Sequence, residues 1–198
     1  VYLTYRILDI SDLTVDGTMC TGGAVCIMCM LNGCNVWVAL LAATGAGMLA
    51  GLATGIFHTC MGIPAILAGI LTQLSLYSVN LKIMGKANQA INVDKYDLLV
   101  SLRYIKNVPF FQNTILIVAI IILVLIAALY WFFGTELGSS MRATGCNPNM
   151  SRAQGINTNR NKVLALMLAN GLVAFSSALL AQYQGFADIN MGRGAIVI

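Results

Sequence analysis

The feature that most constrains this chain is an uncharged stretch that is too long for a single membrane crossing. No Asp, Glu, Lys or Arg occurs from Gly17 to Leu81. One helix needs only about 20 apolar residues to cross the hydrocarbon core of a bilayer. Of all 198 residues, 59% are hydrophobic and 9% are charged, whereas about a quarter of the residues in a soluble domain are charged. The sequence therefore predicts an integral membrane protein that folds back on itself within this stretch.

Turn residues divide the uncharged stretch into three predicted passes. Asn and Gly occur together at 32–35, and Gly and Pro interrupt the apolar pattern at 59–64. The middle pass carries Gly47, Gly51 and Gly55 at four-residue spacing, which leaves one helix face without side chains. Such a face lets two membrane helices approach closely, so we predict that these glycines form a helix-packing seam. The predicted passes are Gly17–Leu31, Val36–Phe57 and Ile63–Leu81.

Two further passes are predicted, at Thr114–Phe133 and Val163–Ala181. Residues 82–112, before these two passes, mix charged and apolar residues. Within them, the apolar residues of Tyr96–Ile105 have the spacing of an amphipathic helix at the membrane interface. We predict an all-α polytopic transmembrane helical bundle of about five passes, forming one domain over 1–198. The chain opens on Val1 without a methionine and ends within an apolar run, so we expect partial segments at both ends of a longer protein.

A polar and basic island, Leu137–Lys162, lies between the last two passes. Hydrocarbon cannot accommodate so many polar groups, so the island is expected outside the lipid. Asn147 is a suitable N-cap and Pro148 a suitable first helical residue, while Gly155 is a typical left-handed stop. These residues predict a short helix at Asn149–Gln154. Its exposed residues Met150, Ala153 and Ile156 are candidates for docking into a partner's groove, with Arg142 and Arg152 supplying charge.

Polar side chains within or beside the apolar passes are candidates for lining a translocation path. Asp12 and Asp16 lie four residues apart, and therefore share one face if that segment is helical. The alternatives are that the two aspartates only mark the polar entrance to the first full pass, or that the polar groups make hydrogen bonds between helices. The candidate path residues are Asp12, Thr14, Asp16, Gln73 and Asn80.

The sequence argues against several other functions. It has no GxxxxGK[ST] loop for a nucleotide and no nucleophile with a partner base, so we expect neither ATP binding nor enzymatic catalysis in this chain. The Cys26–x–x–Cys29 pair and the single His58 make a poor metal site, because such sites usually need four ligands. The modest net charge of +4 is typical of membrane topology signals rather than nucleic-acid binding.

Five stretches of the chain resemble segments of one class of transporter. Arg142-Ala143-Thr144-Gly145-Cys146-Asn147-Pro148 followed by Gly155-Ile156 resembles the coupling segment of ABC importer permeases of the ribose and branched-chain amino-acid class, and the DLTVDG motif at 12–17 is similar to another segment of that class. The combination of DLTVDG with the stretches at 63–72, 77–88 and 181–194 is similar to bacterial permeases assigned to tryptophan and tyrosine import. The chain departs from the class pattern in two places, since Ser176-Ser177 replaces Ala-Gly and Cys146 replaces a glycine or polar residue.

The resemblance implies a multi-pass permease subunit of the bacterial cytoplasmic membrane. It would form a homodimer in membrane lipid, receive substrate from an extracytoplasmic binding protein, and be driven by separate ATPase subunits that bind ATP. The resemblance also implies that the island is cytoplasmic and that 82–112 is external, which charge counting does not decide because the two segments carry four and five Lys or Arg. The residues expected to couple to the ATPase are Arg142, Gly145, Asn147, Pro148, Arg152, Gly155 and Ile156.

Two other functional classes stay open at this level. A gradient-driven secondary transporter or channel subunit would usually place ionisable groups in the membrane, and the complete passes after Asp16 carry none. A membrane assembly scaffold would have no polar cavity between its passes. A polar cavity among the helices would therefore favour transport over the scaffold.

Overall fold

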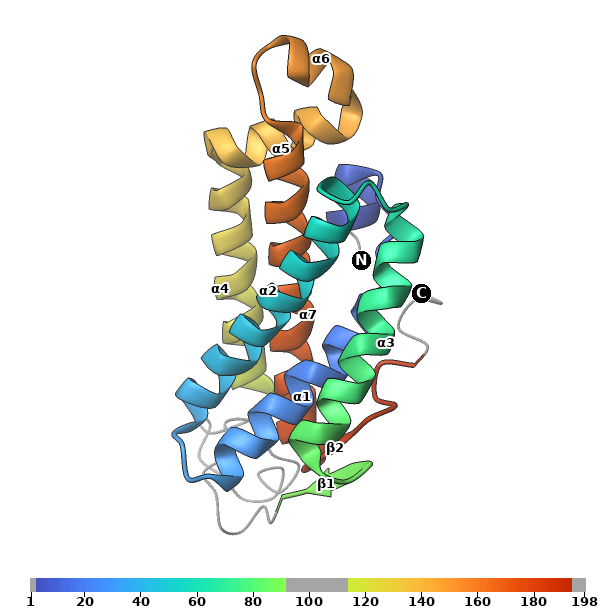
Figure 1. The fold of residues 1–198 in the computed structure, drawn as a ribbon. Helices are drawn as coiled ribbons and strands as arrows, with labels where there is room; N and C mark the ends of the chain where they lie inside the picture. Colours follow the sequence, from blue (N-terminus) through green and yellow to red (C-terminus); the bar gives the residue numbers. More distant parts are fainter. Residues whose placement is uncertain (1–2, 92–113, 194–198) are drawn as a thin grey trace.

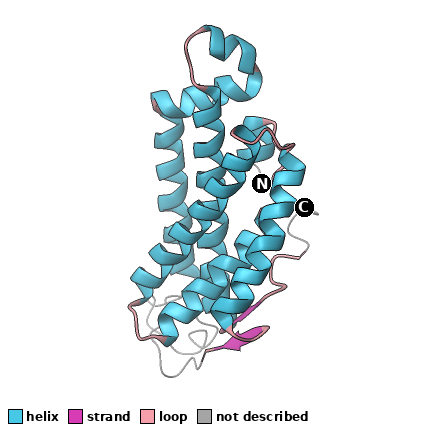
Figure 2. Ribbon diagram, viewed as in Figure 1, coloured by secondary structure: helices cyan, strands magenta, loops and turns pink. Residues whose placement is uncertain are grey.

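The computed structural model describes residues 3–91 and 114–193, and the predicted interfacial helix at Tyr96–Ile105 lies outside these ranges. The described chain is a helical bundle with one small sheet (Figures 1 and 2). It begins with a short π-helix, η1. The elements in order are η1 (Leu3–Ile7), α1 (Val15–Leu31), α2 (Val36–Thr59), α3 (Ala65–Met84), β1 (Asn88–Ala90), α4 (Thr114–Gly134), α5 (Glu136–Cys146), α6 (Pro148–Ala153), α7 (Thr158–Gln184) and β2 (Phe186–Asp188).

The all-α polytopic fold predicted from the sequence is confirmed, with one difference in how the chain crosses the membrane. Four described helices, α2, α3, α4 and α7, are long and apolar enough to span a bilayer. Helix α1 has only 17 residues, about 25 Å at 1.5 Å per residue, which is shorter than the hydrocarbon core. An irregular segment, residues 9–14, separates it from η1. The first predicted pass, Gly17–Leu31, therefore lies within one continuous but short helix, and the break in the chain precedes it.

Helix α7 is the axis of the bundle. It packs along α2 and α1, and α1 in turn contacts α3, so that four helices share one core (Figure 1). The buried residues at this core are mostly small or flexible, as is usual where membrane helices pack closely. They include Ala24, Ile27, Met30, Ala43, Ala178 and Ala181.

The predicted glycine seam of α2 lies against α7. A Cβ atom added at Gly51 would lie 2.8 Å from the carbonyl carbon of Leu166 and closer still to its oxygen. An added Cβ at Gly47 would clash with the carbonyl oxygen of Asn170, and one at Gly55 would lie 3.1 Å from Cα of Val163. Only glycine permits this approach, because any side chain would separate the two backbones.

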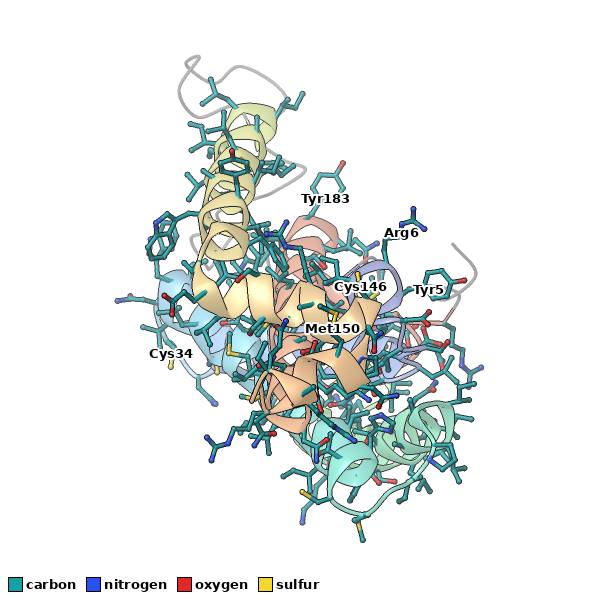
Figure 3. All side chains as sticks on the ribbon, turned by 90° about the horizontal axis from the view of Figure 1, so that it is seen from above. Tyr5, Arg6, Cys34, Cys146, Met150 and Tyr183 are labelled. Carbon is teal, nitrogen blue, oxygen red and sulfur yellow. The ribbon has the colours of Figure 1, made fainter. Side chains whose placement is uncertain are left out.

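Helix α4 stands apart from this core. Its principal helix contact is with α5, and none of its membrane-spanning window is buried. Viewed from above, α4 leans out to one side of the bundle (Figure 3). A fully apolar helix with an exposed surface is stable only where lipid or another apolar surface covers it.

The two ends of the bundle carry different structures. Helices α5 and α6 lie at one end with η1, whereas the β1–β2 ribbon lies at the other (Figure 1). The strands pair antiparallel, with Asn88 opposite Asp188, and tie the end of α3 to the end of α7. The island and the start of segment 82–112 therefore lie at opposite ends, as the single pass between them predicts.

The sequence analysis missed helix α5, which occupies the first half of the island. Its two glycines and two serines disfavour a helix in isolation, but tertiary contacts compensate. Met141 is 2% exposed and packs beside Leu8 and Ala165, and Thr144 is also buried. Helix α7 also begins five residues before the predicted Val163, because Asn157 caps its N-terminus by accepting a hydrogen bond from the Arg160 backbone N–H.

We predict that Gly51→Ala destabilises the protein, because the new methyl group would meet the α7 backbone. The expected loss is about 1–3 kcal/mol, typical of overpacking, and is measured as a lower apparent Tm of the purified protein in detergent. The matched control is Gly45→Ala on the same helix, where an added Cβ has no neighbour within 4 Å among the described atoms. An unchanged Tm for Gly51→Ala would show that the two helices are not closely packed there.

Candidate functional site: a capped external helix, a buried polar network and a polar cavity

Helix α6 is built by the capping residues expected from the sequence. The Asn147 side-chain oxygen accepts hydrogen bonds from the backbone N–H groups of Asn149 (3.1 Å) and Met150 (3.0 Å), and Pro148 is the first helical residue. Gly155 has a φ of +83°. It closes the helix with Ile156 in a Schellman motif, in which their N–H groups donate to the carbonyls of Arg152 and Ser151. The helix is one residue offset from the predicted Asn149–Gln154.

The two arginines expected to supply charge to a partner also hold this end of the molecule together. Arg152 Nε donates to Thr158 Oγ1 at 2.9 Å, which ties α6 to the first turn of α7. Arg142 Nη2 donates to the carbonyl of Phe133 at 2.9 Å, which ties α5 to the end of α4. Met150 is 59% exposed and lies on the outer end of the protein (Figure 3). The side chain best placed for a partner is therefore this methionine.

Helix α5 is fixed to both of its neighbours. The Asn161 amide donates to Ser140 Oγ (3.1 Å) and Thr144 Oγ1 (3.0 Å), which joins α7 to α5. Gly145 lies so close to the backbone of Ile7 that a Cβ atom would overlap the Ile7 carbonyl oxygen. Gly145, a predicted coupling residue, therefore makes a close backbone contact between α5 and η1.

A network of buried polar side chains crosses the middle of the bundle. Asn170, at the centre of α7, donates to Asp12 Oδ2 (2.8 Å) and accepts from Thr18 Oγ1 (2.7 Å). Thr14 and Thr54 join their hydroxyls at 2.8 Å, and Thr54 donates to Thr72 Oγ1 at 3.0 Å. The network thereby links the chain before α1 to α1, α2, α3 and α7.

This network also explains the break between η1 and α1. Asp12 is not helical, so it does not share a helix face with Asp16, and its Oδ1 accepts the backbone N–H of Thr14 at 2.9 Å. Irregular backbone at membrane depth is tolerated where protein groups satisfy it. Thr14 is fully buried. The predicted path residues Asp12 and Thr14 therefore make hydrogen bonds to polar groups at the break before α1 and on the neighbouring helices α2 and α7.

The other three predicted path residues, Asp16, Gln73 and Asn80, line one polar cavity of about 130 Å³, which we call the Asp16 cavity. Oxygen Oδ1 of Asp16 and Oδ1 of Asn80 are buried and accept no hydrogen bond from any described residue. The cavity lies between α1, α3 and the segment after β2. The described residues that line it are Asp16, Gly17, Cys20, Gln73, Leu74, Tyr77, Asn80, Ile189, Asn190 and Arg193.

The sequence analysis missed several polar residues of these sites. Asn170 and Asn161 stand within or beside the fifth apolar pass, and Thr18, Thr54 and Thr72 lie within the first three. The signal for Asn170 was present, since an asparagine amid apolar residues in a membrane helix is costly without partners. Arg193 lies outside every predicted pass, and only the fold brings it to α1 and α3.

Comparison with known proteins assigns the chain at the level of a family. Residues 1–198 match the family described as Branched-chain amino acid transport system / permease component. The chain is 38% identical to the tyrosine transport system permease protein of Clostridioides difficile (strain R20291), an alignment that covers 100% of this chain and 64% of that protein. It is 28% identical to the autoinducer 2 import system permease protein LsrC of Yersinia pestis (strain Pestoides F), over 96% of this chain and 51% of that protein.

A third relative, an uncharacterized protein of Rickettsia prowazekii (strain Madrid E), is 36% identical over 100% of this chain and 67% of its own length. The chain therefore spans from about half to about two thirds of the length of these relatives. No solved structure matches the chain significantly. The resemblance to importer permeases that the motifs predicted is confirmed by the family match and by these relatives.

We predict that Asn170→Ala destabilises the bundle, because it removes the side-chain amide that donates to Asp12 Oδ2 and accepts from the Thr18 hydroxyl. The expected loss is about 1–3 kcal/mol, the cost of a buried polar group left unsatisfied, and is measured from the apparent Tm in detergent. Ser176→Ala on the same helix is the control, because Ser176 is exposed and its hydroxyl donates only within α7. Equal Tm values for the two variants would contradict this account of the network.

Proposed function

Since the chain belongs to the branched-chain amino acid transport system / permease component family, a family of transport proteins rather than enzymes, we propose that it is the permease subunit of an ATP-driven bacterial importer. In this proposal a separate ATPase subunit binds ATP and an extracytoplasmic binding protein delivers the substrate. Two copies of the permease form the path within the membrane lipid. The observation that carries the proposal is a capped, exposed helix at one end of a bundle that contains a polar cavity.

Helix α6 is the proposed contact with the ATPase. Its two caps close a short helix at the end of the bundle, and Met150 is exposed on that helix. An exposed apolar anchor on a rigid helix suits a hydrophobic groove on a partner. In this arrangement the end of the molecule with α5 and α6 is cytoplasmic, and the end with the β1–β2 ribbon faces the binding protein.

Helix α7 is the proposed route from the ATPase contact to the path. Movement of α6 reaches α7 through the Arg152–Thr158 hydrogen bond. Farther along α7, Asn170 bonds to Asp12 and Thr18 at the break before α1. Helix α1 then carries Asp16, which lines the cavity. Helix α7 is hydrogen-bonded to α6 at one point and to the start of α1 at another. It can therefore move α6 and α1 together, because packed cores respond as units.

An aromatic amino acid is the proposed substrate. The support is the printed name of the relative that is 38% identical, a tyrosine transport system permease, together with the motifs shared with tryptophan and tyrosine permeases. The Asp16 cavity also contains groups of both charges beside an aromatic ring.

A gradient-driven transporter is the rival functional class. It requires that the protein take up substrate under an ion gradient without any ATPase.

We predict that Met150→Glu abolishes stimulation of ATP hydrolysis by the loaded binding protein, because a charge would enter the apolar ATPase groove. The measurement uses the full-length complex in proteoliposomes, and we expect stimulation to fall by at least about tenfold, the loss of a central interface anchor. The matched control is Met61→Glu. Met61 is 65% exposed in the α2–α3 turn at the same end of the molecule, so its variant should retain stimulation. Full stimulation with Met150→Glu would refute α6 as the ATPase contact.

A further inference from the structure

The Asp16 cavity holds a carboxylate oxygen that has no hydrogen-bond partner among the described residues. Asp16 accepts no hydrogen bond on Oδ1, although this oxygen is buried. The residue lies in the first turn of α1. A carboxylate at membrane depth is costly unless it is paired, and such residues usually mark a ligand or ion pathway. The contrast with Asp12, both of whose oxygens accept hydrogen bonds, shows that the fold can satisfy an aspartate where the role is structural.

A second acceptor lies in the same cavity. Asn80 is 0% exposed, its amide donates to the Gly17 carbonyl at 3.4 Å, and its Oδ1 accepts no hydrogen bond from any described residue. A buried acceptor without a donor costs about as much as a lost hydrogen bond. A positively charged group with several N–H donors would satisfy both Asn80 and Asp16. An ammonium group has this chemistry.

Arg193 gives the cavity a charge of the opposite sign. It lines the same cavity as Asp16, yet the two side chains form no ion pair. A guanidinium binds carboxylates well and would repel a bound inorganic cation. A cavity that offers two acceptors at one place and a guanidinium at another is complementary to a molecule that carries both charges.

Close backbone contacts hold these groups in place. A Cβ atom added at Gly192 would overlap the backbone of Asp16, so the segment after β2 lies directly on α1. A Cβ atom added at Gly17 would lie 3.1 Å from Cα of Gln73, so α3 also lies close to α1. The site is therefore assembled from three parts of the chain before any ligand arrives, which reduces the cost of binding.

We infer that the Asp16 cavity is a transit site for the head group of a zwitterionic α-amino acid. The ammonium donates to Asp16 and Asn80, and Arg193 binds the carboxylate. The side chain of the amino acid lies against Leu74 and Tyr77, which are 64% and 46% exposed. The cavity's 130 Å³ is less than the roughly 300–1,000 Å³ of sites that enclose a whole ligand. The inference rests on the proposed transport function and assigns the groups that recognise its substrate.

The test is equilibrium dialysis of the full-length protein, purified with its ATPase in nanodiscs and without the binding protein. The probes are L-tyrosine, tyramine, which lacks the carboxylate, and 3-(4-hydroxyphenyl)propionate, which lacks the ammonium. We expect tyrosine to bind at least about tenfold more tightly than either analogue, because each analogue leaves polar groups of the site unpaired. Asp16→Asn should remove the preference over the propionate and keep the preference over tyramine, and Arg193→Gln should do the reverse.

Asp9→Asn is the matched control. Asp9 lies outside the Asp16 cavity and has a φ of +55°, a conformation that asparagine tolerates well, so this variant should keep both preferences. An absence of tyrosine binding, equal affinity for the three probes, or an unaltered preference in Asp16→Asn would overturn the inference. ATP hydrolysis by the same preparation separates this result from the proposed function. Stimulation by the loaded binding protein without selective tyrosine binding would refute only the site.

Discussion

The close contact between α2 and α7 is the interaction on which the rest of the structure depends. In a bilayer the hydrophobic effect does not drive two apolar helices together, so their association relies on van der Waals packing and hydrogen bonds. Gly47 and Gly51 let the backbones of α2 and α7 approach. This approach places α7 at the centre of the bundle, in contact with α1 and α5 as well. The asparagines of α7 then reach groups on several other elements.

The bundle contains two contrasting kinds of polar group, those that are hydrogen-bonded to these asparagines and those that have no partner among the described residues. Asn161 makes hydrogen bonds at one end of the bundle and Asn170 in its middle. The bonds of Asn161 to Ser140 and Thr144, and those of Asn170 to Asp12 and Thr18, join different parts of the chain. Such bonds contribute about 0.6–2 kcal/mol each in membranes, so they fix geometry more than they add stability. Asp16 and Asn80 have buried oxygens outside this network. A ligand bound in the Asp16 cavity would satisfy these two oxygens.

The sequence was sufficient for features that depend on neighbouring residues along the chain. Asn147, Pro148 and Gly155 predicted both ends of α6 to within one residue, because caps act through local hydrogen bonds. The long helices were also predictable, because the length of an apolar run can be read directly from consecutive residues. Features that depend on distant contacts were missed. Helix α5 contains poor helix formers and is stabilised by the burial of Met141.

The candidate site was predictable only in part. Polarity within apolar runs selected Asp16, Gln73 and Asn80, which the fold brings into one cavity. The same criterion selected Asp12 and Thr14, which take part in the buried network instead, because polarity alone does not show whether a group finds a partner. Arg193 could not be predicted, since the β1–β2 pairing and the close approach at Gly192 bring it to the cavity.

The central claim is that the end of the bundle with α6 meets the ATPase. Site-specific photo-crosslinking in the full-length complex tests it most directly, with the photoreactive residue placed at Met150 or, in the β1–β2 ribbon, at Gln89. The account predicts that the crosslinker at Met150 captures the ATPase subunit and that the one at Gln89 does not. Capture of the ATPase from Gln89 but not from Met150 would reverse the orientation and contradict the account.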